Sequence, residues 1–135
     1  MRISYSLLFL MLAVFFLGTV VSSCSDSDED IAAPTITFIQ PHANDTIHLL
    51  NGSLTIKVKA EDKVNIKDME MVLTDESGNI SEEYDNDYID NQSYTCYEPF
   101  ELTGITHKTK MTLRVTFENE FKNWSAKSIV FYVKP

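Results

Sequence analysis

Basic residues are scarce in this chain, and their scarcity limits the partners it can have. Lysine and arginine number 11 against 20 aspartate and glutamate residues, so the formal net charge over 135 residues is -9. A nucleic-acid-binding protein needs a basic surface to neutralise phosphates, so we predict no nucleic-acid partner. The same imbalance argues against a protein held on anionic lipids by charge alone.

Glycine, proline and cysteine are also few, with four, four and two residues. So little glycine and proline is not typical of a disordered chain. The sequence has no GxSxG elbow, no phosphate-binding loop and no zinc-protease helix, and its histidines and cysteines lack zinc-ligand spacing. We therefore predict a single non-catalytic domain without a resident cofactor.

One long apolar run is present, at residues 7–21, and Arg2 precedes it. As a helix this run would span about 22 Å, which is short of the hydrocarbon core of a membrane at about 30 Å. A basic start, a short apolar middle and a small-residue exit are typical of a secretory signal peptide. Residues 1–23 are therefore predicted to be a signal peptide that is cleaved off.

The exit, Val21-Ser22-Ser23-Cys24, resembles the lipobox of bacterial lipoproteins. In that family the cysteine thiol is acylated and the cysteine becomes the new N-terminus, which implies cleavage between Ser23 and Cys24 and lipidation of Cys24. About three acyl chains exceed the two signals that stable anchoring needs. Because lipid then occupies Cys24, Cys96 has no disulfide partner and is expected to be buried and inert.

The residues that follow Cys24 have almost nothing to bury. Residues 25–30 read Ser-Asp-Ser-Asp-Glu-Asp, and such a run is solvated and extended. We interpret residues 24–33 as the lipidated cysteine and an acidic tether. The run also resembles the acidic export signal of lipoproteins in the Bacteroidetes phylum, which implies display on the outer face of the outer membrane. A plain soluble spacer is the alternative.

From residue 34 to residue 135, short segments alternate apolar and polar residues, and turn-forming residues separate them. Strands are expected at about 35–39, 46–50, 54–60, 66–74, 94–105, 111–117 and 128–133, with 80–93 as an acidic loop or a poorly formed edge. Pro99 predicts that its strand lies at an edge or starts late. About seven short strands with frequent turns predict an all-β fold, an antiparallel immunoglobulin-like β-sandwich.

Two turns of this domain resemble turns of bacterial immunoglobulin-like domains. Residues 60–66, AEDKVNI, are similar to the turn after the second strand of that family. Residues 119–125, NEFKNWS, are similar to the turn before the last strand, with Asn119 in place of aspartate and Lys122 in place of glycine. The resemblance covers residues 34–135 and implies the sandwich fold, which many different functions share.

The acidic segment offers a candidate calcium site. Asp85, Asp87 and Asp90 supply the hard oxygen ligands that calcium prefers. Their spacing does not match an EF-hand, because Ile89 stands where an oxygen ligand belongs. A solvated acidic loop without a metal is the alternative.

Aromatic residues near this segment form a second candidate site. Tyr84, Tyr88 and Trp124 are candidate ligand-binding residues, because an aromatic face beside carboxylates and amides suits stacking on a sugar ring. The alternative is structural: Tyr94 and Tyr97 pack inside the sandwich, Tyr84 and Tyr88 lie in a loop, and Trp124 covers one end of the core.

These patterns together predict a lipoprotein with a single immunoglobulin-like domain, of the kind found in Bacteroidetes, on the outer membrane. The N-terminal lipid would attach it to the membrane, and the domain would bind a protein or a glycan. We expect a non-catalytic binding or accessory module. A structural subunit of a larger surface complex and a glycan-binding accessory protein are the alternatives.

Overall fold

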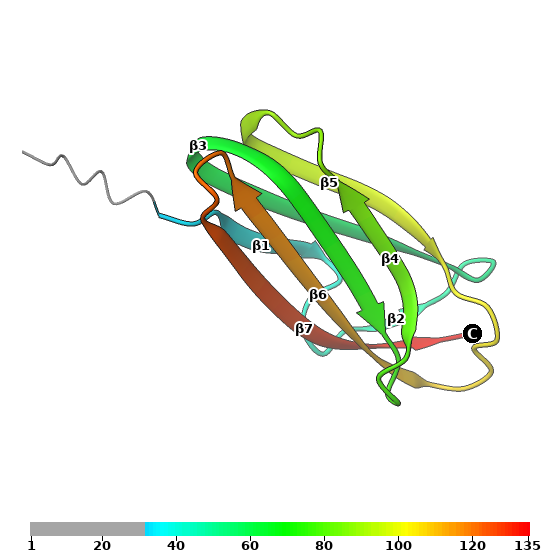
Figure 1. Ribbon diagram of the computed structural model, residues 1–135. Helices are drawn as coiled ribbons and strands as arrows, with labels where there is room; N and C mark the ends of the chain where they lie inside the picture. Colours follow the sequence, from blue (N-terminus) through cyan, green and yellow to red (C-terminus); the bar gives the residue numbers. More distant parts are fainter. Residues whose placement is uncertain (1–31) are drawn as a thin grey trace, which may run out of the picture.

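The computed structural model describes residues 32–135, which form seven strands and no helix (Figure 1). The predicted signal peptide, the cleavage site at Ser23 and Cys24, and most of the tether lie outside the described residues. No helix that could cross a membrane is found in residues 32–135. The strands are β1 (Thr35–Gln40), β2 (Thr46–His48), β3 (Ser53–Thr74), β4 (Ile80–Asn86), β5 (Asn91–Glu101), β6 (Thr109–Asn119) and β7 (Trp124–Lys134).

The long strand β3 belongs to both layers of the fold, and Figure 1 shows it curling over from one layer to the other. Its first part, up to Glu61, lies between β1 and β5, and its second part, from Ile66, lies between β4 and β6. The second layer continues through β7 to β2, which pairs with β7 in parallel. All other pairs are antiparallel. The predicted all-β, immunoglobulin-like sandwich of about seven strands is confirmed, with this one parallel pair.

The predicted turn at residues 60–66 is wrong in form, because the backbone stays extended there. The ladder instead slips between Glu61 and Ile66. The Asp62 carboxylate accepts hydrogen bonds from the backbone N–H groups of Lys63 and Val64, at 2.6 and 3.4 Å. Such local bonding and an irregular ladder let one strand bend from one sheet into another.

The core lies between the two layers and consists of the residues that alternate inward along the strands. Its largest fully buried side chains include Phe117, Phe131 and Leu54, and each such side chain contributes about 1.5–3 kcal/mol when buried. Cys96 is buried here as a free thiol, as expected. Burial raises the pKa of Cys96 to about 11, so it stays protonated and unreactive at neutral pH.

Several predicted segments have different boundaries, and the strands predicted at 54–60 and 66–74 are the single strand β3. Residues 80–86, expected to be an acidic loop or a poorly formed edge, form the regular strand β4, which pairs only with β3 among the described strands and so lies at an edge. β7 begins at Trp124 rather than near residue 128. β5 begins at Asn91 and pairs only with β3 among the described strands, so the edge position predicted from its proline is confirmed.

Candidate functional site

One buried amide ties together the end of the sandwich where the described chain begins, which we call the N-terminal end. Asn119 is fully buried, and its Nδ2 donates to Asp62 Oδ2 at 3.0 Å and to the carbonyl of Ala32 at 3.2 Å. Its Oδ1 accepts from the backbone N–H groups of Phe121 and Asn123, at 3.0 and 3.1 Å. All four hydrogen-bonding positions of the amide are used. The two turns that resemble the immunoglobulin-like family therefore contact each other.

The three candidate calcium ligands are not brought together. Asp90 accepts a hydrogen bond from Asn65 Nδ2 at 2.9 Å and pairs with the Lys67 ammonium. The hydrogen bond that Lys67 donates and the positive charge of Lys67 lower the pKa of Asp90, and the hydrogen bond from Asn65 contributes less. Asp85 faces solvent from β4, and Asp87 is exposed in the connection that follows. Within residues 32–135 no group of three His, Cys, Asp or Glu side chains could hold a metal ion.

The structural alternative placed Tyr94 and Tyr97 inside the sandwich, but in the structure a different pair of tyrosines packs there. Tyr84 and Tyr94 are half-buried and pack against the core, and the Tyr94 ring meets Phe117 edge-on at 6.5 Å. Burial, with smaller effects from its neighbours, raises the pKa of Tyr84. Tyr97 is 66% exposed on β5 and Tyr88 is 90% exposed in the β4–β5 connection. Tyr84 therefore contributes to packing, whereas Tyr97 does not.

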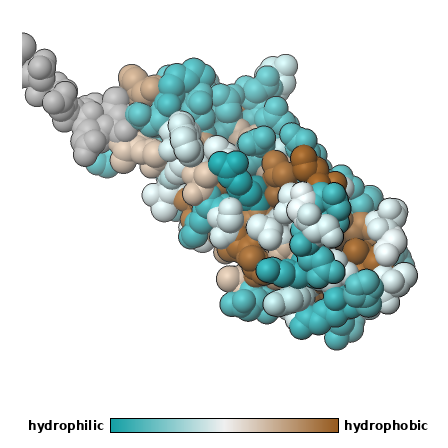
Figure 2. Space-filling view, turned by 60° about the horizontal axis from the view of Figure 1, so that its bottom comes forward, coloured by the Kyte–Doolittle hydropathy of each residue, from teal (hydrophilic) through white to brown (hydrophobic). Residues whose placement is uncertain are grey.

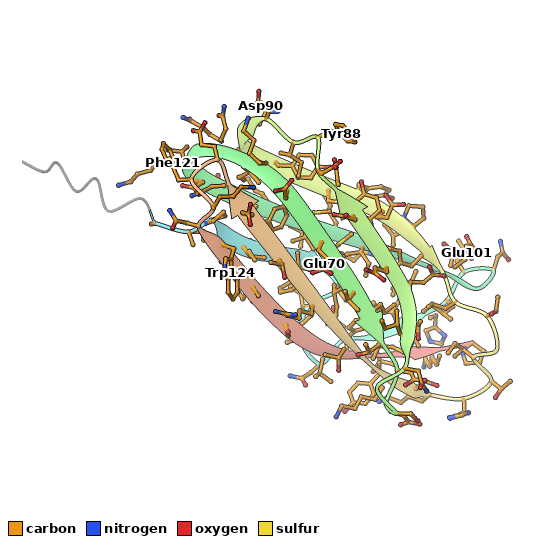
Figure 3. The ribbon with its side chains drawn as sticks, viewed as in Figure 1. Glu70, Tyr88, Asp90, Glu101, Phe121 and Trp124 are labelled. Carbon is orange, nitrogen blue, oxygen red and sulfur yellow. The ribbon has the colours of Figure 1, made fainter. Side chains whose placement is uncertain are left out.

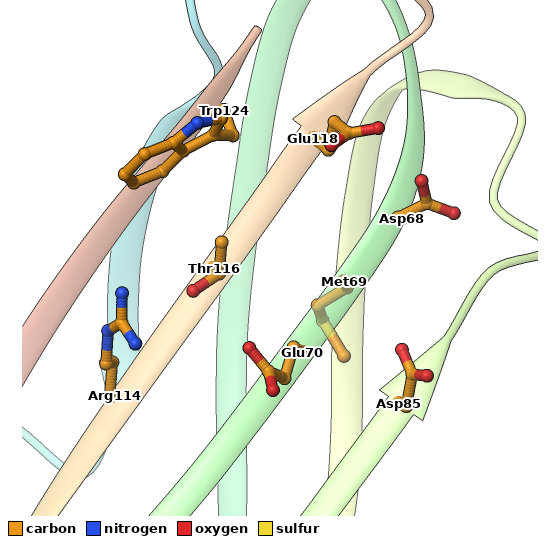
Figure 4. Close-up of a pocket in the computed structure, with 8 residues that line it drawn as sticks. All are labelled: Asp68, Met69, Glu70, Asp85, Arg114, Thr116, Glu118 and Trp124. Atoms are coloured by element: carbon orange, nitrogen blue, oxygen red, sulfur yellow. The ribbon is translucent and has the colours of Figure 1, made fainter. Parts of the chain in front are cut away.

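Trp124 does not cover the end of the core. It lies at the start of β7, is 60% exposed and points away from the sandwich (Figure 3). Its indole forms one wall of an open hollow of about 300 Å³ on the outer face of the second layer (Figure 4). The hollow is lined by Asp68, Met69, Glu70, Asp85, Arg114, Thr116, Glu118 and Trp124.

The alternation that builds the core also builds this hollow. Met69 and Met71 on β3 are buried, so Glu70 between them faces outward. The same alternation turns Thr116 of β6 outward. The ladder places Glu70 opposite Asp85 on one side and opposite Thr116 on the other. Polar groups from three strands therefore share one exposed surface.

The hollow contains two pairs of carboxylates, and the two members of each pair lie opposite each other on adjacent strands. Asp68 lies opposite Glu118, and Lys122 bridges them with N–O distances of 3.7 and 2.6 Å. The hydrogen bond to Glu118 is the main reason that the pKa of Lys122 is raised. Lys122 reaches them from a left-handed backbone conformation with φ of 64°, at the position where the resembling family has glycine.

The second pair, Glu70 and Asp85, has no such cation. In the part of the chain that the structure describes, neither carboxylate accepts a hydrogen bond or forms an ion pair. Arg114 lies on the neighbouring strand β6, two residues from the Thr116 that pairs with Glu70, and forms no ion pair with any described residue. Like charges directly opposite each other in a sheet are destabilising. Sequence reasoning did not identify this pair, because the two residues are separated in the sequence and only the register of β3 and β4 brings them together.

A second hollow, without charged side chains, lies at the opposite, C-terminal end of the sandwich. Its volume is about 480 Å³, and it is lined by Leu49, Asn51, Gly52, Leu102, Thr103, Gly104, Ile105 and Pro135. Leu50 beside it is 78% exposed. In Figure 2, where the lower side of Figure 1 faces the reader, hydrophobic patches interrupt a mostly hydrophilic surface. The hollow has no charged side chain to orient a ligand, so it is the weaker candidate.

No protein-family model matches this chain, and no curated protein matches it. The grounds for a function are therefore the geometry of the hollow beside Trp124 and the motifs of the sequence.

Proposed function

We propose that this chain is a lipid-anchored binding module of a bacterial outer membrane, displayed at the cell surface and without catalysis of its own. The observation that carries the binding role is the hollow beside Trp124. An exposed indole next to carboxylates, a guanidinium and a hydroxyl combines a flat apolar surface with a few orienting polar groups. Sites that recognise ligands are typically built this way.

The anchor is supported by the sequence around Cys24, which resembles a lipobox. Residues 24–33 would connect the lipid to the sandwich, and ten residues span at most about 35 Å. The first described residues lie at the N-terminal end of the sandwich (Figure 1). A lipid-anchored domain would therefore stay close to the membrane, with the hollow beside Trp124 open to the side.

Palmitate labelling and detergent-phase partitioning of the full chain test the anchor. The native chain should incorporate label and enter the detergent phase, whereas Cys24→Ser should do neither. Cys96→Ser is the matched control, because it removes the only other cysteine and should leave both properties unchanged. Label retained in Cys24→Ser contradicts the anchor. Protease added to intact cells should remove the domain, and full protection contradicts surface display.

Intrinsic fluorescence tests the binding role, because Trp124 is the only tryptophan in the chain. We expect a saturable change in emission when the full chain in detergent is titrated with at least one class of soluble probe. The probes are neutral oligosaccharides, short basic peptides and short acidic peptides. Tyr97→Ala, which changes an exposed aromatic outside the hollow, should respond like the native chain. No change with any class contradicts a binding role for this hollow.

The structural alternative is a subunit of a larger surface complex. It predicts that the chain purified from detergent-solubilised membranes retains a protein partner in a fixed ratio. A chain that purifies alone and responds to soluble probes supports the free binding module.

A further inference from the structure

The two carboxylate pairs of the hollow differ in a way that indicates a ligand. Both pairs place like charges opposite each other in adjacent strands, which costs stability. Lys122 of the chain itself neutralises Asp68 and Glu118. No cation among the described residues does this for Glu70 and Asp85. We infer that a partner protein supplies the missing cation, an arginine or lysine side chain that binds between Glu70, Asp85 and Trp124.

This inference rests on the proposed function and names the partner that the hollow would bind. The position of the indole favours a long side chain. Glu70 lies on β3 and Trp124 on β7, and β6 with Thr116 runs between them. Thr116 pairs with Ala126, so Trp124 also lies two residues further along β7, and the two backbone positions are about 12 Å apart. A long side chain can place its charged head between the carboxylates and lay its apolar stem across Thr116 toward the indole (Figure 4).

A metal ion fits this pair less well than an organic cation does. Calcium takes 6–8 oxygen ligands, and Glu70 and Asp85 supply only two side chains. A third metal-ligating side chain is not found beside them within residues 32–135. A guanidinium is planar, carries five N–H donors and pairs with carboxylates through two hydrogen bonds at once, and it also stacks on aromatic rings.

Charge on the whole domain points the same way. The hollow has four carboxylates against the guanidinium of Arg114 and the ammonium of Lys122, and residues 34–135 hold 16 acidic and 10 basic residues. Such a surface attracts basic segments from a distance and repels acidic ones, which gives specificity as well as faster association. The partner segment is therefore expected to be basic, with its key side chain seated beside Trp124.

The experiment uses the full chain in detergent and two synthetic peptides. One is acetyl-Gly-Arg-Gly-Arg-Gly-amide, and the other has citrulline, which is neutral and has the same shape, in place of each arginine. Binding is followed by Trp124 fluorescence and by calorimetry. We expect the arginine peptide to saturate, the citrulline peptide to bind at least about tenfold more weakly, and added salt to weaken the arginine peptide.

Glu70→Gln should weaken the arginine peptide by about fivefold. The matched control is Glu101→Gln, which removes the same charge from the opposite end of the sandwich (Figure 3) and should leave binding within about twofold. Because Glu70→Gln also removes a like-charge contact, its melting temperature should rise while its binding weakens. Equal weakening by both variants would show a non-specific charge effect and overturn the inference.

Other ligand classes give distinct results. A response to neutral oligosaccharides without one to the arginine peptide keeps the binding module but overturns the basic partner in favour of a glycan. Equal binding of the citrulline peptide, or a saturable response to calcium that Glu70→Gln abolishes, also overturns it. No response to any probe contradicts both this inference and the proposed function.

Discussion

The two ends of the sandwich are closed by different chemistry. At the N-terminal end, Asn119 and Asp62 join the β6–β7 hairpin to the bend in β3 by directed hydrogen bonds. At the C-terminal end, Leu102 fills the space between the layers, and its backbone N–H donates to the carbonyl of Gly52 at 2.7 Å. Directed bonds position nearby groups more closely than apolar packing does. The hollow on the outer face reaches this end at Glu118 and Trp124, beside the hairpin that these hydrogen bonds hold.

The largest effect on the N-terminal end is expected from Asn119→Ala. The change removes four hydrogen bonds, which Asn119 makes with the Asp62 carboxylate, the carbonyl of Ala32 and the backbone N–H groups of Phe121 and Asn123. We expect a loss of about 2–4 kcal/mol in the free energy of unfolding, measured in urea. Trp124 emission should shift as well, since the hairpin before it loosens.

Asn91→Ala is the control for that experiment. Asn91 is exposed and no side-chain hydrogen bond is found for it among the described residues. Its replacement should change stability by no more than about 0.5 kcal/mol. If Asn119→Ala cost less than about 1 kcal/mol, the amide would not be what holds this end together.

The matching change at the C-terminal end is Leu102→Ala. Leu102 is 5% exposed, and truncating a buried leucine costs about 2–3 kcal/mol through lost burial and the cavity left behind. Trp124 emission in the folded state should stay unchanged, in contrast to Asn119→Ala. The exposed Leu50→Ala is the control and should be nearly neutral. A shift of Trp124 emission in Leu102→Ala would show that the two ends are coupled.

The sequence predicted the fold class because the core strands alternate clearly, as in the segment with Leu54, Ile56 and Val58. It left β4 open between a loop and a poorly formed edge, because the inward row of that strand contains Glu82, Tyr84 and Asn86 instead of an apolar series. These side chains are half-buried at the edge of the sheet. Pairing with β3, and not hydropathy, therefore makes this segment a strand.

The candidate site was predicted only in part. Trp124 and Asp85 were both selected as site residues, but for different ligands and at different places. What joins them is the register that sets Asp85 against Glu70 and Trp124 against Glu118. A periodic pattern shows which residues share a face of one strand, but it does not show which strand comes next to it or in what register. Glu70 and Arg114 were missed for this reason.

A smaller effect is expected from Lys122→Gly at the N-terminal end. Lys122 has a left-handed backbone with φ of 64°, which costs a residue with a side chain about 1 kcal/mol relative to glycine. Its exposed ion pairs with Glu118 and Asp68 contribute little in return. Lys122→Ala removes the ion pairs but keeps the strain, so Lys122→Gly should be about 1 kcal/mol more stable than Lys122→Ala in thermal or urea unfolding. Equal stabilities would mean that the turn relaxes.

The smallest expected effect is on the pH dependence of stability, and it is tested with one aspartate from each end. The pKa of Asp90 is lowered mainly by the charged Lys67, and the pKa of Asp75, in the β3–β4 turn, is lowered mainly by its hydrogen bonds to the neutral Asn79. Because both folded values lie below the ordinary 3.8, each carboxylate contributes stability above that pH and loses it as the pH falls through the folded value. Asp90→Asn and Asp75→Asn should each flatten the fall in stability below about pH 4.

Salt separates the two aspartates, because it screens a charge but not a hydrogen bond to an amide. In carboxyl NMR titrations, raising the salt to about 1 M should move the pKa of Asp90 toward its ordinary value and leave that of Asp75 in place. Lys67→Gln should raise the pKa of Asp90 even at low salt, since it removes the charge. If salt left both pKa values in place, Lys67 would act on Asp90 only as a hydrogen-bond donor, and the contrast between the two aspartates would be wrong.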